Sequence, residues 1–298
     1  MPDPLREELC SGVRRLTATT ALLQQNRRMH PTAGLFEAAD LQWWWAQRPR
    51  PTDELAQPVW FDSDGTPSAA VCATAFDDEV QLDPLVLPDA SPEWRVHVME
   101  RGIAHAEKWS MDSLSLEVDQ ADRVLAEALA EWGFTCEPNG GLVEAWLAAA
   151  ERRSVSSLSE GYRLVDRAEQ PDGPHPMTVA GRNHADLEAR LGSTSLYRAD
   201  LDLAVLAADG SLAAYGLFWY DPVSATGLVE PMRTEDEHQR RGLARHVLTS
   251  GIDRLVAAGA ERIKICFDPG NPAASHLYLD VGFVPERRND RFTCAALR

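Results

Sequence analysis

The chain of 298 residues is poor in lysine and cysteine, and it lacks any long hydrophobic run. No window approaches the ~20 consecutive apolar residues of a membrane-spanning helix, so we expect no membrane association. The five cysteines are widely spaced and form no CxxC pair, so neither a disulfide framework nor a metal site is indicated. The opening residues, MPDPLREELC, are polar where a signal peptide needs an apolar core, which predicts a cytoplasmic protein.

Positive charge is also scarce. Acidic residues outnumber basic ones by 46 to 29, the formal net charge is −17, and all but two of the basic residues are arginine. Such a chain has no excess of cations to displace phosphate counterions, so we expect no general binding to nucleic acid. One local anion site remains compatible with this charge, and the negative field weakly favours a cationic substrate. The length suggests about two domains.

The two halves of the sequence contain similar segments in the same order. LSLEVDQADRVLAEALAEWGF and IKICFDPGNPAASHLYLDVGF both read as an apolar strand, an aspartate, a helix and a Gly-Phe pair. Two further pairs of segments agree upstream. The matched ranges are 114–134 with 263–283, 64–78 with 209–221, and 82–85 with 229–232. Collinear agreement of three pairs indicates a duplication.

The boundary between the halves is predicted in LAAAERRSVSSLSEG (147–161), whose serines and charges suit an exposed linker. A division near Ser156 gives domains 1–155 and 156–298. The hydrophobic periodicity of the second domain predicts an α/β (α+β) fold, with a mixed, mostly antiparallel sheet flanked by helices. Strands are expected at 162–167, 201–208, 213–220, 227–232, 262–267, 283–286 and 291–297, and helices within 174–200, at 239–257 and at 271–282.

A short basic segment, EHQRRGLARH (237–246), lies between a predicted strand and a predicted helix. The first turn of a helix presents unpaired N–H groups and a partial positive charge. Gly242 leaves the backbone accessible, Ala244 keeps the next contact small, and three arginines add charge. These features predict a pyrophosphate site, although the sequence matches neither GxGxxG nor a Walker loop. The alternative is a helix start whose arginines are solvated or paired with carboxylates.

Together with its surroundings, this segment resembles the GNAT superfamily of acyl-CoA-dependent N-acetyltransferases. Gln239, Gly242 and Ala244 match the pattern Q/R-x-x-G-x-G/A, and Asn271, Tyr278 and Gly282-Phe283 follow at the family's spacing. The resemblance covers residues 161–298 and implies acetyl-CoA as cosubstrate. The cofactor-binding residues that it implies are Pro231, Met232, Arg233, Arg240, Arg241, Gly242, Leu243, Ala244, Arg245 and Asn271.

The same resemblance implies roles for two reacting side chains. Acetyl transfer needs a neutral amine, and an amine with a pKa of ~10.4 is mostly protonated at neutral pH, so a base helps. Glu230 occupies the strand position of the family's base, although it is equally well read as a carboxylate that binds the substrate ammonium. Tyr278 is expected to protonate the CoA sulfur, the alternative being core packing. Asn271 is expected to contact the pantetheine arm, to cap its helix, or both.

Acceptor residues are less clearly marked. Tyr197, Asp200 and Asp202 precede a long strand and could line a pocket for an amine, or could only pair locally. In LQWWWAQRPRP (41–51), three adjacent tryptophans cannot share one helix face, so we expect at least one to be exposed or to face a neighbouring domain or the acceptor.

The first half is predicted to be a degenerate, structural GNAT-like domain. Leu129 stands at the position of Tyr278, Asp83 at that of Glu230, and SPEWR (91–95) replaces the glycine-containing loop. A tandem arrangement with a decayed first half resembles that of the mycothiol synthase family.

The sequence therefore predicts an acetyl-CoA-dependent N-acetyltransferase whose acceptor is the primary amine of a small molecule or peptide. The amine would attack the thioester directly, and the protein would be a monomer or a homodimer. Two alternatives remain open: an acyl-CoA-binding or regulatory module without turnover, and a mycothiol-synthase-like acetyltransferase.

Overall fold

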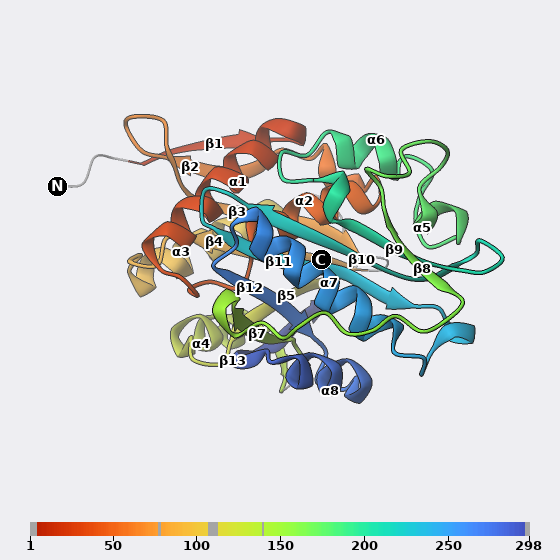
Figure 1. Cartoon of the computed structure of the whole chain (residues 1–298). Coiled ribbons are helices and arrows are strands. Elements are labelled where there is room, and N and C mark those ends of the chain that lie inside the picture. The colour runs from red at the N-terminus through yellow and green to blue at the C-terminus, as the bar shows by residue number, and fades with distance from the viewer. Residues whose placement is uncertain (1–4, 77–78, 107–112, 139, 296–298) are drawn as a thin grey trace. The chain divides into compact units, whose positions relative to one another are not determined.

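The computed structural model describes residues 5–76, 79–106, 113–138 and 140–295 (Figure 1). These residues form two compact units that exchange short segments along the sequence. Unit 1 takes its residues from 1–41, 49–143 and 287–298, and unit 2 takes its residues from 42–48 and 144–286. The main change of unit along the chain falls between residues 143 and 144, before the division predicted near Ser156, and the segments 42–48 and 287–298 are exchanged.

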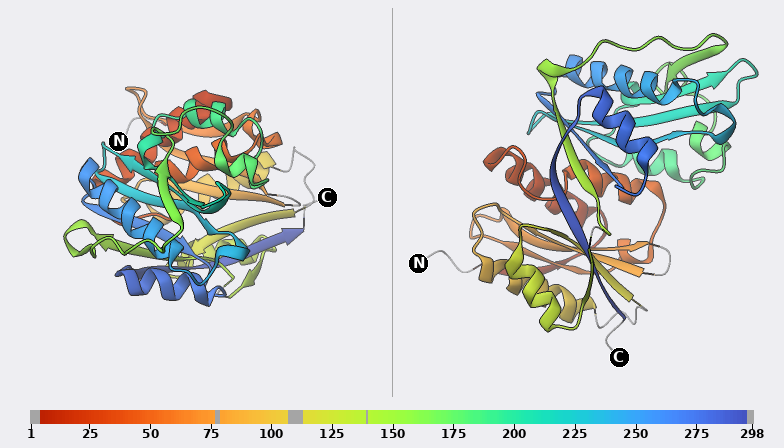
Figure 2. Two further views of the ribbon diagram at one scale, coloured as in Figure 1. Left: turned by 45° about the vertical axis from the view of Figure 1, so that its right-hand side comes forward. Right: turned by 90° about the horizontal axis from the view of Figure 1, so that it is seen from below.

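Unit 1 contains a sheet whose strands follow one another mainly in antiparallel order. The order across the sheet is β1 (Arg6–Cys10), β2 (Gln57–Phe61), β3 (Pro67–Phe76), β4 (Glu79–Val86), β5 (Ser113–Asp119) and β13 (Val284–Ala295), with β6 (Thr135–Glu137) also paired to β13. The helices are α1 (Gly12–Met29), the start of α2 (Ala38–Gln47), the short η1 (Pro51–Asp53), α3 (Pro92–Ala106) and α4 (Arg123–Glu131). Figure 2 shows α1 on one face of this sheet and α3 and α4 on the other.

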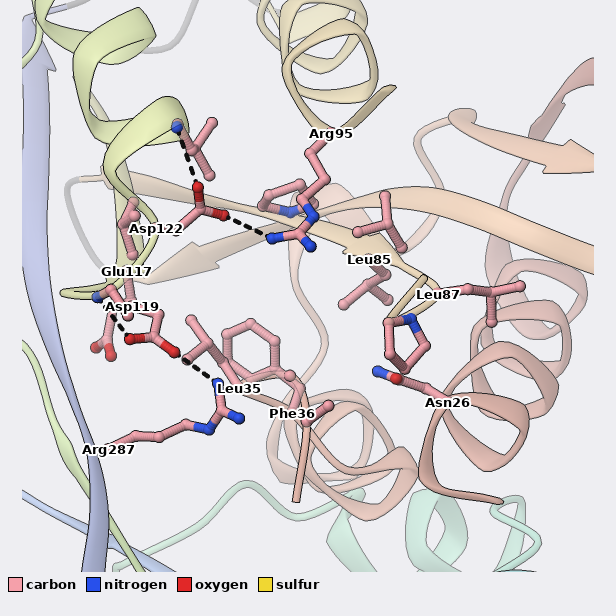
Figure 3. Close-up of a pocket in the computed structure, with 18 of the residues that line it drawn as sticks. Asn26, Leu35, Phe36, Leu85, Leu87, Arg95, Glu117, Asp119, Asp122 and Arg287 are labelled. Atoms are coloured by element: carbon pink, nitrogen blue, oxygen red, sulfur yellow. Dashed lines mark hydrogen bonds and ion pairs between the residues drawn. The ribbon is translucent and has the colours of Figure 1, made fainter. Parts of the chain in front are cut away.

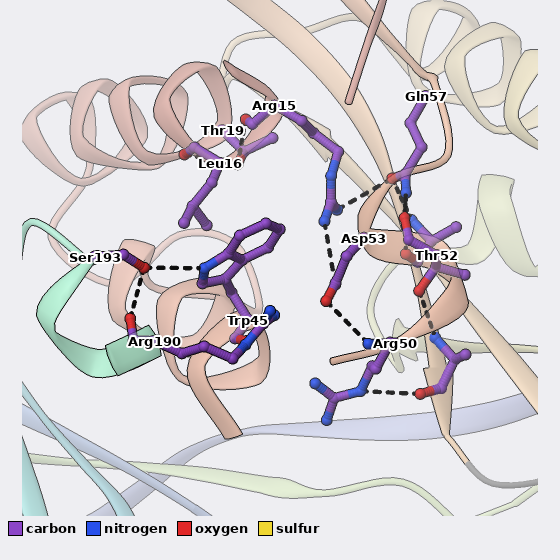
Figure 4. A network of polar contacts seen from close by, with 12 residues as sticks. Arg15, Leu16, Thr19, Trp45, Arg50, Thr52, Asp53, Gln57, Arg190 and Ser193 are labelled. Carbon is purple, nitrogen blue, oxygen red and sulfur yellow. Dashed lines mark hydrogen bonds and ion pairs between the residues drawn. The ribbon is translucent and has the colours of Figure 1, made fainter. Parts of the chain in front are cut away.

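Several polar side chains that are buried in unit 1 find hydrogen-bond partners there. The amide of Gln57 donates to the Thr52 carbonyl at 2.9 Å and accepts from Arg15 at 3.2 Å. The backbone N–H of Arg50 donates to Asp53 at 3.0 Å, which fixes the short η1 turn (Figure 4). Such pairing offsets the cost of taking these groups out of water.

Unit 2 contains a second mixed sheet. Its order is β7 (Val143–Ala148), β12 (Arg262–Phe267), β11 (Thr226–Thr234), β10 (Leu212–Asp221), β9 (Asp202–Ala207) and β8 (Tyr162–Asp166). The pairs from β8 to β11 are antiparallel, and β11 pairs with β12 in parallel. The helical segments are η3 (Ala149–Glu151), α5 (Pro176–Val179), α6 (Leu187–Gly192), η4 (Ala199–Leu201), η5 (Asp236–His238), α7 (Leu243–Ala258) and α8 (Pro272–Val281). The predicted α/β class with a mostly antiparallel sheet is confirmed.

Two predicted elements differ from the structure. The helix expected from residue 239 begins at Leu243, because Arg240 and Gly242 have φ angles of 60° and 76°, which lie outside the helical region. The two closing strands are one strand, β13, since the polar residues between them pair with β5: Asn289 lies opposite Asp119 and Asp290 opposite Val118. The last two residues of the second predicted strand, 296–297, lie outside the described residues.

Within the described part of the chain, no helix has both the length and the apolar character needed to cross a bilayer.

Candidate active site

The strands β11 and β12 of unit 2 pair over only a short distance. Their parallel register runs from Thr226 opposite Arg262 to Leu228 opposite Lys264 and then stops. Beyond that point, no residue of β11 is paired with β12, although β11 continues to Thr234. The backbone of 229–234 therefore has β10 on one side and is available on the other side to an extended ligand, as in strand addition.

A β-bulge lies at the predicted base. Gly216 on β10 faces Met232, and Phe218 faces Val229, so one residue of β10 is opposed by Glu230 and Pro231 of β11. Proline cannot donate a ladder hydrogen bond, and a bulge is a position that tolerates it. The indole N–H of the buried Trp219 donates to the Glu230 carbonyl at 2.7 Å and so holds the bulge in place.

The predicted anion site lies at the N-terminus of α7. Gly242 is the N-cap residue and no side chain caps the helix, so the N–H groups of the first turn have no partner within the helix. Gly242 has φ +76°, and a Cβ there would meet no atom within 4 Å. Glycine is therefore required by the backbone angle, and the open space leaves the main chain accessible. Arg240 also has a positive φ, a strained conformation that is concentrated at functional sites.

The loop before α7 is anchored by the segment that the sequence marked as an exposed linker. The hydroxyl of Ser159 donates to the Arg241 carbonyl at 2.5 Å. Nδ1 of His246 donates to the Ser156 carbonyl at 2.5 Å, and the Ser156 N–H donates to the Thr249 hydroxyl at 3.1 Å. Residues around Ser156 and Ser159 are thus partly buried against α7, because their polar groups find partners there.

The arginines of the loop fall into two groups. Arg240 and Arg241 are exposed, and no ion pair is found for either within the described residues. Arg245 instead pairs with Asp280 on α8, and Arg233 lies 3.3 Å from Asp236. Among the described residues, the guanidinium groups of Arg240 and Arg241 therefore have no ion-pair partner, and they precede the first-turn N–H groups of α7, which have no partner within the helix. This arrangement suits a polyanionic ligand.

Tyr278 lies on α8, 8% exposed, between two aromatic rings. Its ring centroid is 5.7 Å from that of Phe267 and 6.4 Å from that of Phe283. Burial, and secondarily the charge of Glu230, raises the pKa of Tyr278 to about 12. The helix ends at Gly282, φ 117°, where the Phe283 N–H donates to the Tyr278 carbonyl at 3.1 Å. The packing alternative is thus observed, while protonation of the CoA sulfur by Tyr278 remains a prediction.

Asn271 is the N-cap of α8. Its side-chain oxygen accepts from the Ala274 N–H at 3.2 Å, and Pro272 follows at the first helical position. The capping alternative is thus observed, while the pantetheine contact remains a prediction.

The three acceptor candidates separate in the structure. Tyr197 donates to Asp202 at 3.0 Å, and Nε2 of His175 donates to the same carboxylate oxygen at 2.7 Å. Burial and the adjacent Asp202 raise the pKa of Tyr197. Asp200 instead pairs with Arg198 at 2.6 Å. His175 was missed by sequence reasoning, because it lies 27 residues before its partner and has no local pattern around it.

Residues 42–48, at the end of α2, carry the three tryptophans into unit 2. Trp43 is 2% exposed and lies 6.5 Å from Trp219 between ring centroids. Trp45 donates to the Ser193 hydroxyl at 3.3 Å, and the Arg190 guanidinium lies 4.4 Å from its ring (Figure 4). Trp44 is half-buried and the other two are buried, so none of the three tryptophans is exposed.

Unit 1 repeats the parted strands but not the loop. Among the described residues, β4 and β5 pair at Val80 with Leu114 and at Gln81 with Ser115, and they are not paired beyond that point. Leu129 is fully buried on α4, and Asp83 is fully buried on β4. Burial raises the pKa of Asp83 well above the usual carboxyl value, partly offset by its hydrogen bond from Gln81.

Comparison with known proteins agrees with this geometry. Residues 165–283 match the family model described as the acetyltransferase (GNAT) family. A tandem GNAT protein from the clavulanic acid biosynthesis pathway superposes with a TM-score of 0.68 at 15% identity, covering 99% of both chains. A GCN5-related N-acetyltransferase from Sphaerobacter thermophilus superposes with a TM-score of 0.63 at 14% identity, covering 100% of this chain and 98% of that one.

A third similar structure is a GCN5-related glucosamine N-acetyltransferase region of a fungal multi-domain β-N-acetylglucosaminidase. Its TM-score is 0.56 at 14% identity, and the match covers 99% of this chain and 38% of that chain. At these identities the likeness establishes the fold alone. No curated protein sequence matches the chain.

Residues 165–283 therefore match the model of the GNAT family, and the chain as a whole has the fold of a tandem GNAT protein. This match supports acetyl transfer as the general chemistry. In the part of the chain that the structure describes, no group of three or more His, Cys, Asp or Glu side chains is placed to hold a metal ion.

Proposed function

We propose that unit 2 is an acetyl-CoA-dependent N-acetyltransferase whose acceptor is the primary amine of a small molecule or peptide. The observation that carries the proposal is the N-terminus of α7, which no side chain caps among the described residues, beside the half of β11 that has left β12. The two features supply different interactions, N–H groups and positive charge for a diphosphate and a free strand edge for an extended amide-containing chain. These are the two parts of coenzyme A that precede its thiol.

The residues that would hold coenzyme A follow from these positions. N–H groups between Arg240 and Arg245, including those of Gly242, Leu243 and Ala244, would bind the diphosphate, and Arg240 and Arg241 would add charge. The backbone of 231–233 (Pro231, Met232 and Arg233) would pair with the pantetheine arm, and an N–H of this segment would stabilise the oxyanion. Asn271 would contact the arm from the start of α8. The cosubstrate supplies an acetyl thioester.

Two side chains of unit 2 would then each transfer a proton. We propose that Glu230, directly or through water, takes the proton of the substrate ammonium, so that the neutral amine attacks the thioester carbonyl. Tyr278, which the raised pKa keeps protonated at neutral pH, would donate its phenolic proton to the departing thiolate. The thioester C–S bond breaks as the C–N bond forms, and the amine proton that is released restores the neutral phenol by way of solvent.

The replacement Gly242→Glu tests the cosubstrate site. A carboxylate here would repel the diphosphate, and we expect the affinity for coenzyme A, measured by calorimetry, to fall at least ~100-fold. Gly210→Glu is the matched control: Gly210 also has a positive φ, +85°, and an added Cβ there also meets no atom within 4 Å. The control shares the backbone strain and should keep its affinity. Unchanged affinity in Gly242→Glu would disprove the loop assignment.

A second experiment separates the enzyme from a binding module without turnover and from a mycothiol-synthase-like enzyme. Thiol release from acetyl-CoA would be followed with a panel of small amines, peptides and a cysteinyl sugar conjugate. Turnover with amines generally supports the proposal, and turnover with the conjugate alone supports the narrower enzyme. Tight binding of coenzyme A without turnover on any acceptor would make unit 2 a binding module.

A further inference from the structure

Unit 1 contains a cavity of about 590 Å³ at the point where β4 and β5 part (Figure 3). Its walls come from α1 and the segment after it, from the ends of β4 and β5, from the starts of α3 and α4, and from Arg287 of β13, all within unit 1. The volume lies in the range of small-molecule sites. The cavity thus occupies, in the first half of the duplicated sequence, the position that the proposed cosubstrate site occupies in the second half.

The start of α3 is unsuited to a diphosphate, in contrast to that of α7. Pro92 opens the helix and has no N–H. The Trp94 N–H donates to the Ser91 hydroxyl at 3.2 Å, and the Arg95 N–H donates to the Ser91 carbonyl at 3.1 Å. A hydrogen bond to its own backbone N–H, followed by one with Ser91, lowers the pKa of Glu93. The donors of this turn are occupied, and a carboxylate already lies where a phosphate would bind.

Polar groups that lack partners point to a different ligand. The side-chain oxygen of Asn26, a residue only 5% exposed on α1, is buried and accepts no hydrogen bond within the described residues. The Nε atoms of Arg95 and Arg287 are likewise buried and donate to nothing in that part of the chain. The side chains of Asn26, Arg95 and Arg287 all line the cavity, and a ligand that both donates and accepts hydrogen bonds would pair with their amide and guanidinium groups.

The charges that line the cavity balance one another. Arg95 pairs with Asp122 at 3.1 Å, and Arg287 pairs with Asp119 at 2.6 Å. Glu117 and the exposed Arg123 complete three carboxylates and three guanidinium groups. A ligand with a large net charge of either sign would leave this balance uncompensated, and coenzyme A is such a ligand.

Apolar side chains form the rest of the wall. Figure 3 shows Leu35, Phe36 and Leu85 between Asn26 and the ion pair of Arg287 with Asp119. From this arrangement we infer that unit 1 binds a small zwitterion of the amino-acid type, with an ammonium and a carboxylate on an apolar body. The apolar body fills the space between the two polar sides, the carboxylate pairs with the guanidinium groups of Arg95 and Arg287, and the ammonium pairs with the amide of Asn26.

Binding of L-leucine, L-methionine, L-phenylalanine and L-tryptophan to the full chain, measured by calorimetry without acetyl-CoA, tests the inference. We expect saturable binding of at least one of them. Matched molecules that lack one charged group, phenethylamine and 3-phenylpropionate for phenylalanine, should bind at least ~10-fold more weakly. If none of the four amino acids binds, or if coenzyme A displaces the bound one from unit 1, the inference is wrong.

Two variants locate the site. Asn26→Leu keeps the side-chain volume and removes a buried acceptor that lacks a partner, so the melting temperature should be unchanged or higher while amino-acid binding weakens at least ~10-fold. Val124→Trp, at a cavity-lining position that is 44% exposed, should block binding without altering the buried polar groups. Glu127→Gln, exposed on the same helix α4 and outside the cavity, is the control and should bind normally.

The outcome is independent of the proposed enzyme. Gly242→Glu should retain amino-acid binding, because the substitution lies in unit 2. Binding that is unaffected by both Asn26→Leu and Val124→Trp would place the amino acid elsewhere and overturn the inference.

Discussion

At the scale of single residues, the proposed reaction depends on a tyrosine that burial keeps protonated. Tyr278 is enclosed by Phe267 and Phe283, and its pKa is raised to about 12. A phenol with a raised pKa retains its proton up to that pH, so ionisation of Tyr278 should cause no loss of activity between pH 7 and 10. The surroundings that make Tyr278 part of the core therefore also keep it in the form that an acid needs.

Tyr278→Phe should lower kcat by about 10²-fold, a typical loss for a general acid, and change the affinity for coenzyme A by less than ~3-fold. Tyr215→Phe is the matched control, since Tyr215 is also buried in unit 2 with a pKa raised by burial. Steady-state kinetics and calorimetry on the three proteins check this expectation. Equal kcat in wild type and Tyr278→Phe would exclude the acid role.

Asp83 should make the stability of the protein depend on pH. Its folded-state pKa is raised, chiefly by burial, so the folded protein binds this proton more tightly than the unfolded chain. Its contribution to stability is then greatest below pH ~4 and is lost as the pH rises towards its folded-state pKa. Asp83→Asn, which keeps an acceptor for Gln81, should raise the melting temperature at pH 8 by roughly 2–4 °C and by less at pH 4. A lower melting temperature at pH 8 would contradict this.

At the scale of elements, the site is formed where regular structure stops. Pairing of β11 with β12 ends at Leu228, and α7 begins only after two residues with positive φ. The loop between them is held by Ser159 at the Arg241 carbonyl and by His246 at Ser156. The segment before β8 therefore stabilises the conformation of the loop before α7.

Ser159→Ala removes one of these hydrogen bonds. A net hydrogen bond is worth ~1 kcal/mol, so the affinity for coenzyme A should fall by about 5-fold, with little effect on global unfolding. Ser157→Ala is the natural control, because Ser157 is exposed in the same segment and no contact of its side chain is found in the described residues. An equal effect of both substitutions would show that the loop does not depend on this anchor.

The strands of unit 2 could be predicted because their apolar runs are bounded by glycine and aspartate, as around 201–208 and 213–220. Gly242 and Tyr278 could be predicted because their spacing is local. Three features could not be predicted, because each depends on residues distant in sequence. They are the hydrogen bond from Ser159 to the Arg241 carbonyl, the contact of His175 with Asp202, and the buried oxygen of Asn26. The continuity of β13 was missed since its polar residues are paired by a strand ~170 positions away.

At the scale of the whole molecule, two exchanged segments make each half of the sequence part of the unit that the other half mainly forms. Unit 1 includes 287–298. Within this segment, β13 pairs with β5 at seven positions, from Asn289 opposite Asp119 to Ala295 opposite Ser113. Unit 2 includes 42–48, with Trp43 against Trp219 and Gln42 donating to Ser195 at 2.8 Å. We propose that the two domains are interdependent for folding.

Residues 1–155 and 156–298, produced separately, should accordingly fail to unfold cooperatively, because each lacks a buried segment of its unit. Co-expression of the two halves should restore a cooperative transition. The transition is measured by circular dichroism on heating. An isolated 156–298 fragment that melts cooperatively and binds coenzyme A would show instead that the division near Ser156 separates self-sufficient domains.

The parting of neighbouring strands recurs in both units, and it is a property of backbone register. Point mutations that erase a catalytic side chain leave such a gap open. A duplicated gene can therefore give up chemistry in one copy and still inherit a vacant recess, ready to evolve a new specificity. A half that has lost catalysis could in this way become a sensor of metabolites for the half that retains it.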